Sequence, residues 1–217
     1  MSSPNAQAET ERVRHLIDKQ APRYDRQMNF FDRVLFPGGR QWACAQTRGD
    51  VLEIAVGSGR NLRFYPDGIS LTAIEFSPEM LELARARAER IGREVNLQLG
   101  DAERLEFADE SFDTVVCTLA LCTIPDPARA VAQANRVLRP GGRFVALEHV
   151  RSPALPVRAV QRMLDPLSVR FQADHLVREP LEYLRAEGFE LEHLERSKWG
   201  IVERTIARKP VGRKAAA

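Results

Sequence analysis

The alternation of short apolar runs with amphipathic stretches predicts an α/β fold. Apolar runs of strand length stand at residues 51–56, 70–76, 95–99, 114–118 and 144–149. Helical patterns fall between them at residues 77–93 and 127–138, and Ser77 followed by Pro78 is a typical start of a helix. Strict alternation of strand and helix predicts a doubly wound, mostly parallel, Rossmann-like sheet in residues 50–150.

The residues before this core are predicted to be cap helices, in residues 1–48. A weak apolar stripe in the first twenty residues predicts a helix that ends near Pro22. The aromatic segment 23–36 predicts a second helix, which the breaker at residues 37–39 closes before a third begins. These helices are expected to cover one edge or one mouth of the sheet.

The residues after the core are predicted to complete a single domain that covers residues 1–217. Residues 151–178 are too long for a simple crossover and predict a helical insertion. Residues 179–210 predict a short helix and two strands, which bring the sheet to seven strands as a hairpin or antiparallel edge pair. The tail, residues 211–217, is predicted to be disordered.

Composition and charge narrow the choice of partner. The 217 residues carry 32 basic and 30 acidic side chains, a net charge of +2, which gives no electrostatic reason to expect nucleic acid. No stretch approaches the roughly 18 consecutive apolar residues of a membrane span, and the N-terminal residues are too polar for a signal peptide. We expect a cytoplasmic monomer or homodimer whose partner is a small molecule.

The cysteines and a series of arginines are the other candidates for a functional role, and the sequence favours an ordinary structural role for both. Cys44, Cys117 and Cys122 are expected to be reduced thiols, and without a neighbouring Cys or His pair they predict no metal site. A basic series within the insertion could meet a lipid headgroup or form an ordinary solvated helix face, and we favour the second interpretation. The series is Arg151, Arg158, Arg162, Arg170 and Arg178.

A glycine turn follows the first predicted strand, at the edge where parallel sheets bind ligands. Gly57 and Gly59 allow a close approach of the backbone to a ligand. A dinucleotide fingerprint needs a third glycine where Leu62 stands, and no Gly-Lys-Ser/Thr follows for a phosphate-binding loop. The turn by itself therefore indicates neither a dinucleotide fingerprint nor a phosphate-binding loop.

Two acids end the next two predicted strands. Glu75 stands sixteen residues after Gly59, and a carboxylate there can accept two hydrogen bonds from a ribose diol. Asp101 ends the third strand and can accept a hydrogen bond from an adenine amino group. A glycine turn and two acids at successive strand ends predict an adenosyl pocket.

The chain resembles the class I S-adenosylmethionine-dependent methyltransferases. The motifs are "VLEIAVGSGRN", "AIEFSPEML", "LGDAERLEFADESFDTVVCTLAL" and "RVLRPGGRFVALEHV", and the resemblance covers residues 24–208. It implies S-adenosylmethionine as cofactor, with Gly57 at the methionine part, Glu75 at the ribose and Asp101 at the adenine. The implied binding residues are Tyr24, Glu53, Ala55, Val56, Gly57, Ser58, Gly59, Asn61, Glu75, Phe76, Met80, Asp101, Ala102, Glu103, Thr118 and Leu119.

Within that superfamily three groups are most similar. "VVCTLALCTIPDPARAVAQANRVLRPGG" with "LEHV" resembles thiol S-methyltransferases, and "APRYDRQMNFF" resembles phosphatidylethanolamine N-methyltransferases and ubiquinone/menaquinone C-methyltransferases. The acceptor expected first is a thiol or amine of a small, partly lipophilic molecule, then a phospholipid amine, then a quinone ring carbon. A non-catalytic cofactor-binding protein and an NAD-linked oxidoreductase stay open as other classes.

Two histidines are candidate general bases. His149 ends the fifth predicted strand and is placed at the ligand edge, where a side chain of near-neutral pKa can take a proton from an acceptor. The alternative is a histidine that braces the following loop by a hydrogen bond. His175, in the predicted insertion, is a weaker second candidate.

Overall fold

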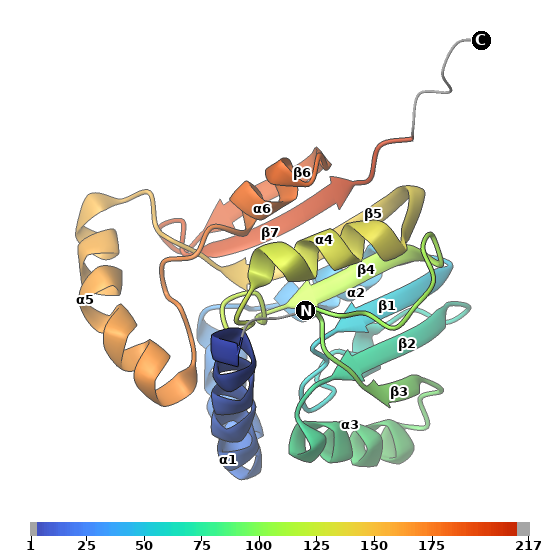
Figure 1. Ribbon diagram of the computed structural model, residues 1–217, viewed down its shortest axis with the longest axis horizontal. Helices are drawn as coiled ribbons and strands as arrows, with labels where there is room; N and C mark the ends of the chain where they lie inside the picture. Colours follow the sequence, from blue (N-terminus) through green and yellow to red (C-terminus); the bar gives the residue numbers. More distant parts are fainter. Residues whose placement is uncertain (1–3, 212–217) are drawn as a thin grey trace.

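A seven-stranded sheet forms the centre of the molecule. The computed structural model describes residues 4–211, and within them the strands are β1 (Asp50–Ile54), β2 (Ser70–Glu75), β3 (Asn96–Leu99), β4 (Phe112–Thr118), β5 (Leu138–His149), β6 (Glu190–Ser197) and β7 (Val202–Arg208). Their spatial order is β3-β2-β1-β4-β5-β7-β6 (Figure 1). Strands β1 to β5 pair in parallel, and β7 lies antiparallel between β5 and β6. The predicted α/β class and mostly parallel sheet are confirmed.

Helices cover both faces of this sheet. They are α1 (Pro4–Val34), α2 (Gly39–Ala45), the 3₁₀ helix η1 (Leu62–Phe64), α3 (Pro78–Ile91), α4 (Pro127–Val137), α5 (Leu155–Gln172) and α6 (Pro180–Ala186). Helices α4 and α6 pack together on one face, while α2 and α3 contact the other. Helix α1 packs on α3, and α5 stands beside α1 at the side of the molecule (Figure 1). No helix among residues 4–211 has the length and apolar character needed to cross a bilayer.

Strand β4 shows how the sheet builds a core on each face. Successive residues of a strand point to opposite faces. Val115 and Cys117 therefore join the cluster under α4, and Val116 joins the cluster under α2 and α3. All three are fully buried. A run that is apolar at every position is typical of a parallel strand covered on both sides.

The prediction that the first helix ends near Pro22 is wrong, because α1 continues through this proline to Val34. A proline inside a helix costs about 3 kcal/mol, so contacts on either side must offset it. Asp18, Asp25 and Asp32 are seven residues apart and so share one helix face. Asp18 accepts a hydrogen bond from Ser77, and the other two form ion pairs with the core. This anchoring on both sides of Pro22 helps to offset the cost of the proline.

Strict alternation of strands and helices is also wrong in two connections. Strands β1 and β2 are joined by turns and the single-turn helix η1, and β3 and β4 by turns over residues 100–111. Arg136 of α4 donates hydrogen bonds to the carbonyl oxygens of Leu105 and Phe107, which fixes the second connection without a helix. Most of the predicted tail, residues 212–217, lies outside the described residues.

Candidate functional site

The carboxyl ends of strands β1 to β4 and helix α1 enclose a cavity of about 110 Å³. This is the edge at which parallel sheets bind ligands. The sequence-predicted residues that line it are Tyr24, Ala55, Gly57, Glu75, Phe76, Met80, Asp101, Ala102 and Leu119. The fold thus brings residues from four strand ends to one cavity, which we call the strand-end cavity.

Glu75 is fixed at this cavity by the backbone on both sides of it. Its Oε2 accepts a hydrogen bond from the Gly57 N–H at 2.8 Å, and its Oε1 accepts one from the Ser77 N–H at 3.0 Å. Burial raises the pKa of Glu75 to about 6, although these N–H groups favour the charged form. Each carboxylate oxygen accepts through one lone pair, so each retains another for a ligand hydroxyl.

Asp101 and Ala102 follow β3 and line the same cavity. The Oδ1 of Asp101 accepts the Glu103 N–H at 2.8 Å, which orients its carboxylate. Glu103 itself lies outside the lining, and its Oε1 accepts the Asp126 N–H at 2.8 Å at the start of α4. This hydrogen bond ties the loop after β3 to the start of α4.

The backbone bends sharply where β1 and β4 reach the strand-end cavity. Ala55 and Leu119 both have φ of 54°, and Gly57 has φ of 56°. For residues other than glycine the left-handed region costs roughly 1–2 kcal/mol, and such strain clusters at ligand sites. A Cβ on Gly57 would meet only the Tyr24 hydroxyl, at 3.9 Å, so this glycine leaves the cavity open.

The rest of the glycine turn serves packing. A Cβ on Gly59 would stand 3.1 Å from the Ala84 Cα, so Gly59 allows the turn to approach α3. Val56 is buried in the core cluster on the same face. The Ser58 hydroxyl donates a hydrogen bond to Asp25 Oδ1 at 2.7 Å. The structure places these three residues outside the lining of the strand-end cavity.

Three further predicted residues form a buried polar network outside that lining. Asn61 donates hydrogen bonds to Glu53 Oε1 at 2.7 Å and to Thr118 Oγ1 at 2.9 Å, and it accepts one from Arg40. Tyr65 donates a hydrogen bond to the other oxygen of Glu53. Burial raises the pKa of Glu53 to about 7, although these hydrogen bonds favour its charged form and so lower the pKa. The network ties β1 and β4 to α2 and so fixes the strand ends.

Helix α1 is held over the glycine turn by ion pairs. Asp25 pairs with Arg60 and with Arg87 of α3, and Asp32 pairs with Arg60 and with Arg40 of α2. The Arg40 guanidinium is nine-tenths buried, so the Asp32–Arg40 pair is well shielded from solvent. These contacts place α1 as one wall of the strand-end cavity.

A second, larger cavity of about 570 Å³ lies between α1, α5 and the end of β5. We call it the helix cavity. Its apolar lining includes Met28, Phe31, Leu35, Leu164, Leu167 and Phe171. The residues that line both cavities are Gln20, Tyr24, Leu119, Thr123 and Gln172. The two cavities therefore adjoin.

The helix cavity contains a histidine paired with a carboxylate. His149 Nε2 lies 2.8 Å from Asp174 Oδ1. Burial alone would lower the pKa of His149, but the charge and hydrogen bond of Asp174 outweigh it and raise that pKa. Cys122 also lines this cavity, and its Sγ lies within 4.8 Å of a ring nitrogen of His149 and of a carboxylate oxygen of Asp174. These three side chains could together hold a metal ion. Burial raises the pKa of the Cys122 thiol, so the thiol stays protonated.

His175, the second candidate base, has a different place. Its backbone N–H donates to the carbonyl oxygen of Cys122 at 3.0 Å, and its side chain is absent from the lining of both cavities. Burial and the nearby Arg178 lower its pKa. Of the two histidines, His149 alone lines one of these two cavities.

Comparison with known proteins agrees with this arrangement. A model of the family described as "Methyltransferase domain" matches residues 52–146. A thiol S-methyltransferase of Homo sapiens is 32% identical over 79% of this chain and 74% of its own length. The chain belongs to the class I S-adenosylmethionine-dependent methyltransferases.

Other relatives of this methyltransferase chain differ in the acceptor that their names give. A phosphatidylethanolamine N-methyltransferase of Cereibacter sphaeroides is 41% identical over 54% of this chain, and a ubiquinone/menaquinone biosynthesis C-methyltransferase of Geotalea daltonii is 33% identical over 64%. The chain spans only 58% and 63% of these two relatives. A solved S-adenosylmethionine-dependent methyltransferase of Thermotoga maritima, described as a possible histamine N-methyltransferase, shares the fold. It has a TM-score of 0.71 and 24% identity, and the match covers 91% of this chain and 99% of that one.

Sequence reasoning missed two acids beside His149, which are Asp174 and the preceding residue of β5, Glu148. Glu148 is 1% exposed, and its Oε1 accepts the N–H groups of Ala120 and Leu121 at 3.0 and 3.1 Å. Burial raises its pKa to about 7. Through its two hydrogen bonds, Glu148 holds the turn after β4 that separates the two cavities. An acid inside the otherwise apolar run that ends β5 was the available signal.

Proposed function

We propose that this protein transfers the methyl group of S-adenosylmethionine to a thiol or amine of a small, partly lipophilic acceptor. The observation that carries the proposal is the contact between the two cavities. The strand-end cavity offers the acid and glycine positions for an adenosyl group, and the helix cavity is apolar and contains His149. Tyr24 and Leu119 line both, so donor and acceptor would meet beside them.

The residues of the strand-end cavity fit the cofactor. Glu75 has acceptor capacity for two ribose hydroxyls, Asp101 for an adenine amino group, and Gly57 leaves room along the turn. The cavity itself, about 110 Å³, is smaller than the roughly 300–1,000 Å³ usual for ligand sites. We therefore expect the wall formed by α1 to move outward when the cofactor binds.

The bound cofactor supplies an activated methyl group on a sulfonium, so the chain has mainly to align the acceptor and exclude water. Leu119 and Tyr24 would fix the direction of approach, because both stand between the cavities. The apolar lining from α1 and α5 would hold the acceptor and keep water out. Alignment of this kind can supply much of a reaction's rate.

His149 is the group that we assign to remove a proton from the acceptor. Its Nε2 faces Asp174, which stabilises the charged imidazolium formed when His149 takes a proton, in the way a carboxylate does beside other catalytic histidines. The proton would pass from the acceptor's S–H or N–H to the ring. An acceptor that is already a thiolate would need this base less.

The residues that line the helix cavity suggest the order in which the acceptor classes are expected. A mostly apolar cavity of about 570 Å³ that also contains the His149–Asp174 pair suits a lipophilic thiol or amine, and a phospholipid amine is the next candidate. Relatives named for thiol and phospholipid methylation support this order. A quinone ring carbon is third, supported by the quinone C-methyltransferase relative.

A methyl-transfer screen tests the proposal. The protein is incubated with methyl-labelled S-adenosylmethionine and short alkyl thiols, phosphatidylethanolamine vesicles or reduced quinones, and labelled product is counted. We expect transfer to a thiol or amine, reduced at least about 100-fold in His149→Ala, as removal of a general base costs. A parallel run with EDTA reports whether Cys122, His149 and Asp174 act through a metal, in which case the base assignment is wrong.

Two further outcomes would contradict the proposal. Tight binding of S-adenosylhomocysteine without transfer to any acceptor class would favour a non-catalytic binding protein. Binding of NAD in calorimetry, with no binding of S-adenosylhomocysteine, would favour an oxidoreductase. His175→Ala is the matched control, because its side chain lies outside both cavities, and we expect it to retain activity.

A further inference from the structure

Helix α5 is fixed to the protein by polar side chains, whereas its apolar side chains are exposed or line the helix cavity. Gln161, 7% exposed, donates hydrogen bonds to the carbonyl oxygens of Val150 and Leu176, and Asp165 accepts one from the Leu176 N–H. These polar residues therefore fix the inner side. A helix that covers a core normally has the reverse arrangement.

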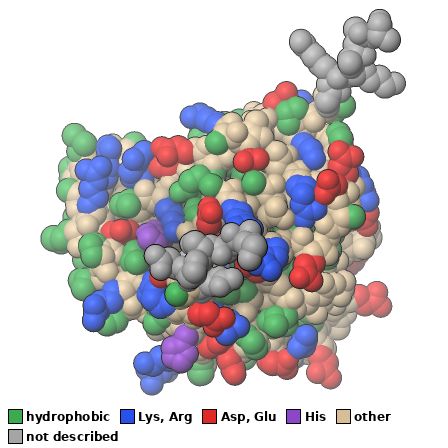
Figure 2. All heavy atoms as spheres, in the orientation of Figure 1, with side chains coloured by type: hydrophobic (Ala, Val, Ile, Leu, Met, Phe, Trp, Pro, Cys, Tyr) green, Lys and Arg blue, Asp and Glu red, His purple; other side chains and the backbone are tan. Residues whose placement is uncertain are grey.

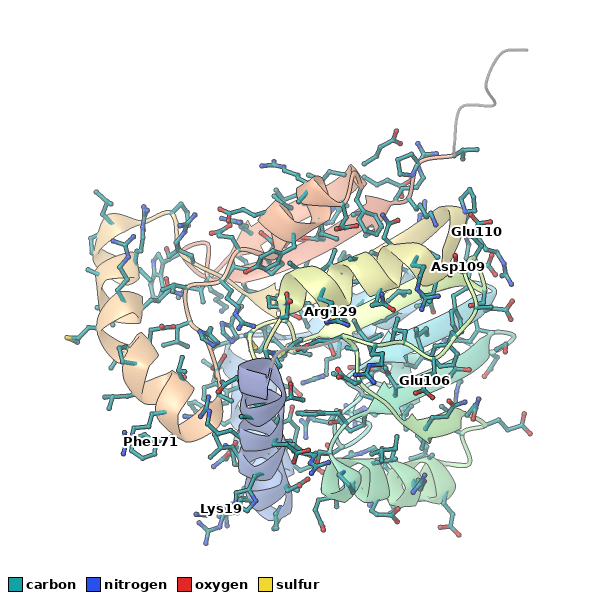
Figure 3. All side chains as sticks on the ribbon, viewed as in Figure 1. Lys19, Glu106, Asp109, Glu110, Arg129 and Phe171 are labelled. Carbon is teal, nitrogen blue, oxygen red and sulfur yellow. The ribbon has the colours of Figure 1, made fainter. Side chains whose placement is uncertain are left out.

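Beside these polar residues α5 carries a continuous, exposed apolar stripe, and part of this stripe also lines the helix cavity. Its members are Val160 at 51% exposed, Met163 at 69%, Leu164 at 43%, Leu167 at 57% and Phe171 at 61%. Positions three, four, seven and eleven residues after the first lie on one side of a helix. Figure 3 shows Phe171 pointing away from the protein near the end of α5. An exposed apolar patch of this kind marks an interaction surface.

The end of α1 extends the same surface. Phe30 is 64% exposed, Phe31 41% and Val34 45%. Phe31 lines the helix cavity together with Leu167 and Phe171 of α5, so the two apolar surfaces meet at one cavity. We call the α5 stripe and these three α1 residues the docking face.

Arginines border the docking face. Arg170 of α5 is exposed and lies one turn after Leu167, with its guanidinium 5.9 Å from the centre of the Phe171 ring. Arg26 and Arg33 are also exposed, and they lie one turn before and after Phe30 on α1. Over α5, on the left of Figure 2, hydrophobic and basic side chains lie together. Apolar side chains bordered by arginine match an anionic bilayer, where the apolar groups enter the acyl boundary and the cations meet the headgroups.

We propose that the docking face binds the surface of an anionic lipid bilayer. Under the proposed function, the helix cavity would then open towards the membrane, and a lipophilic acceptor would enter between α1 and α5. That second part rests on the proposed function, whereas bilayer binding does not. A second copy of the chain on the same face is the competing outcome.

Vesicle co-sedimentation tests the proposal with the full chain. We expect binding to vesicles of phosphatidylcholine with phosphatidylglycerol, and weaker binding to phosphatidylcholine alone or at high salt. The double variant Val160→Glu, Met163→Glu should lower the partition coefficient by about tenfold or more. Arg33→Gln with Arg170→Gln should lower it about fivefold per arginine on anionic vesicles.

The control variant is Leu83→Glu with Ile91→Glu, two residues of α3 that are 36% and 41% exposed. It should bind vesicles as the wild type does. Equal binding by Val160→Glu, Met163→Glu and the wild type would overturn the proposal. The proposal would also be overturned if the wild type forms a dimer in sedimentation velocity, the Val160→Glu, Met163→Glu variant is monomeric, and neither protein binds vesicles.

Methyl transfer separates this proposal from the proposed function. Val160 and Met163 line neither cavity, so their variant should retain transfer to a water-soluble thiol in the absence of vesicles. Vesicle binding without any methyl transfer would contradict the proposed function alone. Transfer without vesicle binding would contradict the docking face alone.

Discussion

Replacing Glu75 with glutamine should weaken cofactor binding without changing the shape of the strand-end cavity. The carboxylate accepts the backbone N–H groups of Gly57 and Ser77 and has one lone pair left on each oxygen. An amide has a single acceptor oxygen and places an NH₂ donor where the second oxygen stood. The Glu75→Gln variant therefore loses one hydroxyl acceptor and sets a donor against one of the two N–H groups.

The size of the effect follows from these hydrogen bonds. A hydrogen bond to a charged group contributes about 1.5–3 kcal/mol, so loss of one ribose contact should raise the Kd for S-adenosylhomocysteine about 10- to 150-fold. The unpaired buried N–H should cost about 1–3 kcal/mol of folding free energy. Both changes should appear together.

Titration calorimetry at pH 8 is the assay, because the pKa of Glu75 is about 6 and the wild-type group is then ionised. Thermal unfolding of the free protein reports the second change. Glu103→Gln is the matched control, since that side chain contacts the Asp126 N–H outside the cavity, and its Kd should stay within about threefold of wild type. If the Kd of the Glu75→Gln variant is also within about threefold of the wild-type value, the assignment of Glu75 to the ribose is refuted.

Three further predictions concern other parts of the site. Asp174→Asn removes the charge that raises the pKa of His149, so the acid side of the pH–rate profile should shift to lower pH, and an unshifted profile would remove His149 as the base. Gly57→Ala should destabilise the protein by about 1–2 kcal/mol in urea unfolding, because φ is 56° there; no change would show that the turn relaxes. Burial raises the pKa of Glu148 to about 7, so the folded state binds its proton more tightly than the unfolded state, and stability should fall as pH rises from about 5 to 8. In Glu148→Gln that fall, measured by thermal unfolding, should be smaller.

The sheet and the strand-end cavity could be predicted because their signals are local. Apolar runs gave the strands, and Glu75 and Asp101 stand where two of those runs end. In a parallel sheet successive strand ends meet at one edge, so position along the chain was enough to gather them. The structure separates the lining residue Gly57 from Gly59, which packs on α3, a difference that spacing alone does not show.

The helical walls could not be predicted in the same way. A proline at position 22 locally favours the end of a helix, but α1 continues through it, and the ion pairs of Asp25 and Asp32 anchor the part that follows. The His149–Asp174 pair joins residues 25 positions apart, and only the path of the insertion brings them together. Long-range pairing of this kind leaves no periodic signal in the sequence.

A crystal structure with S-adenosylhomocysteine tests the central claim most directly. We predict that both ribose hydroxyls lie about 2.5–3.0 Å from the carboxylate oxygens of Glu75, with the sulfur beside Tyr24 and Leu119 and facing the helix cavity. A nucleoside bound elsewhere, or a sulfur that points away from the helix cavity, would contradict the account.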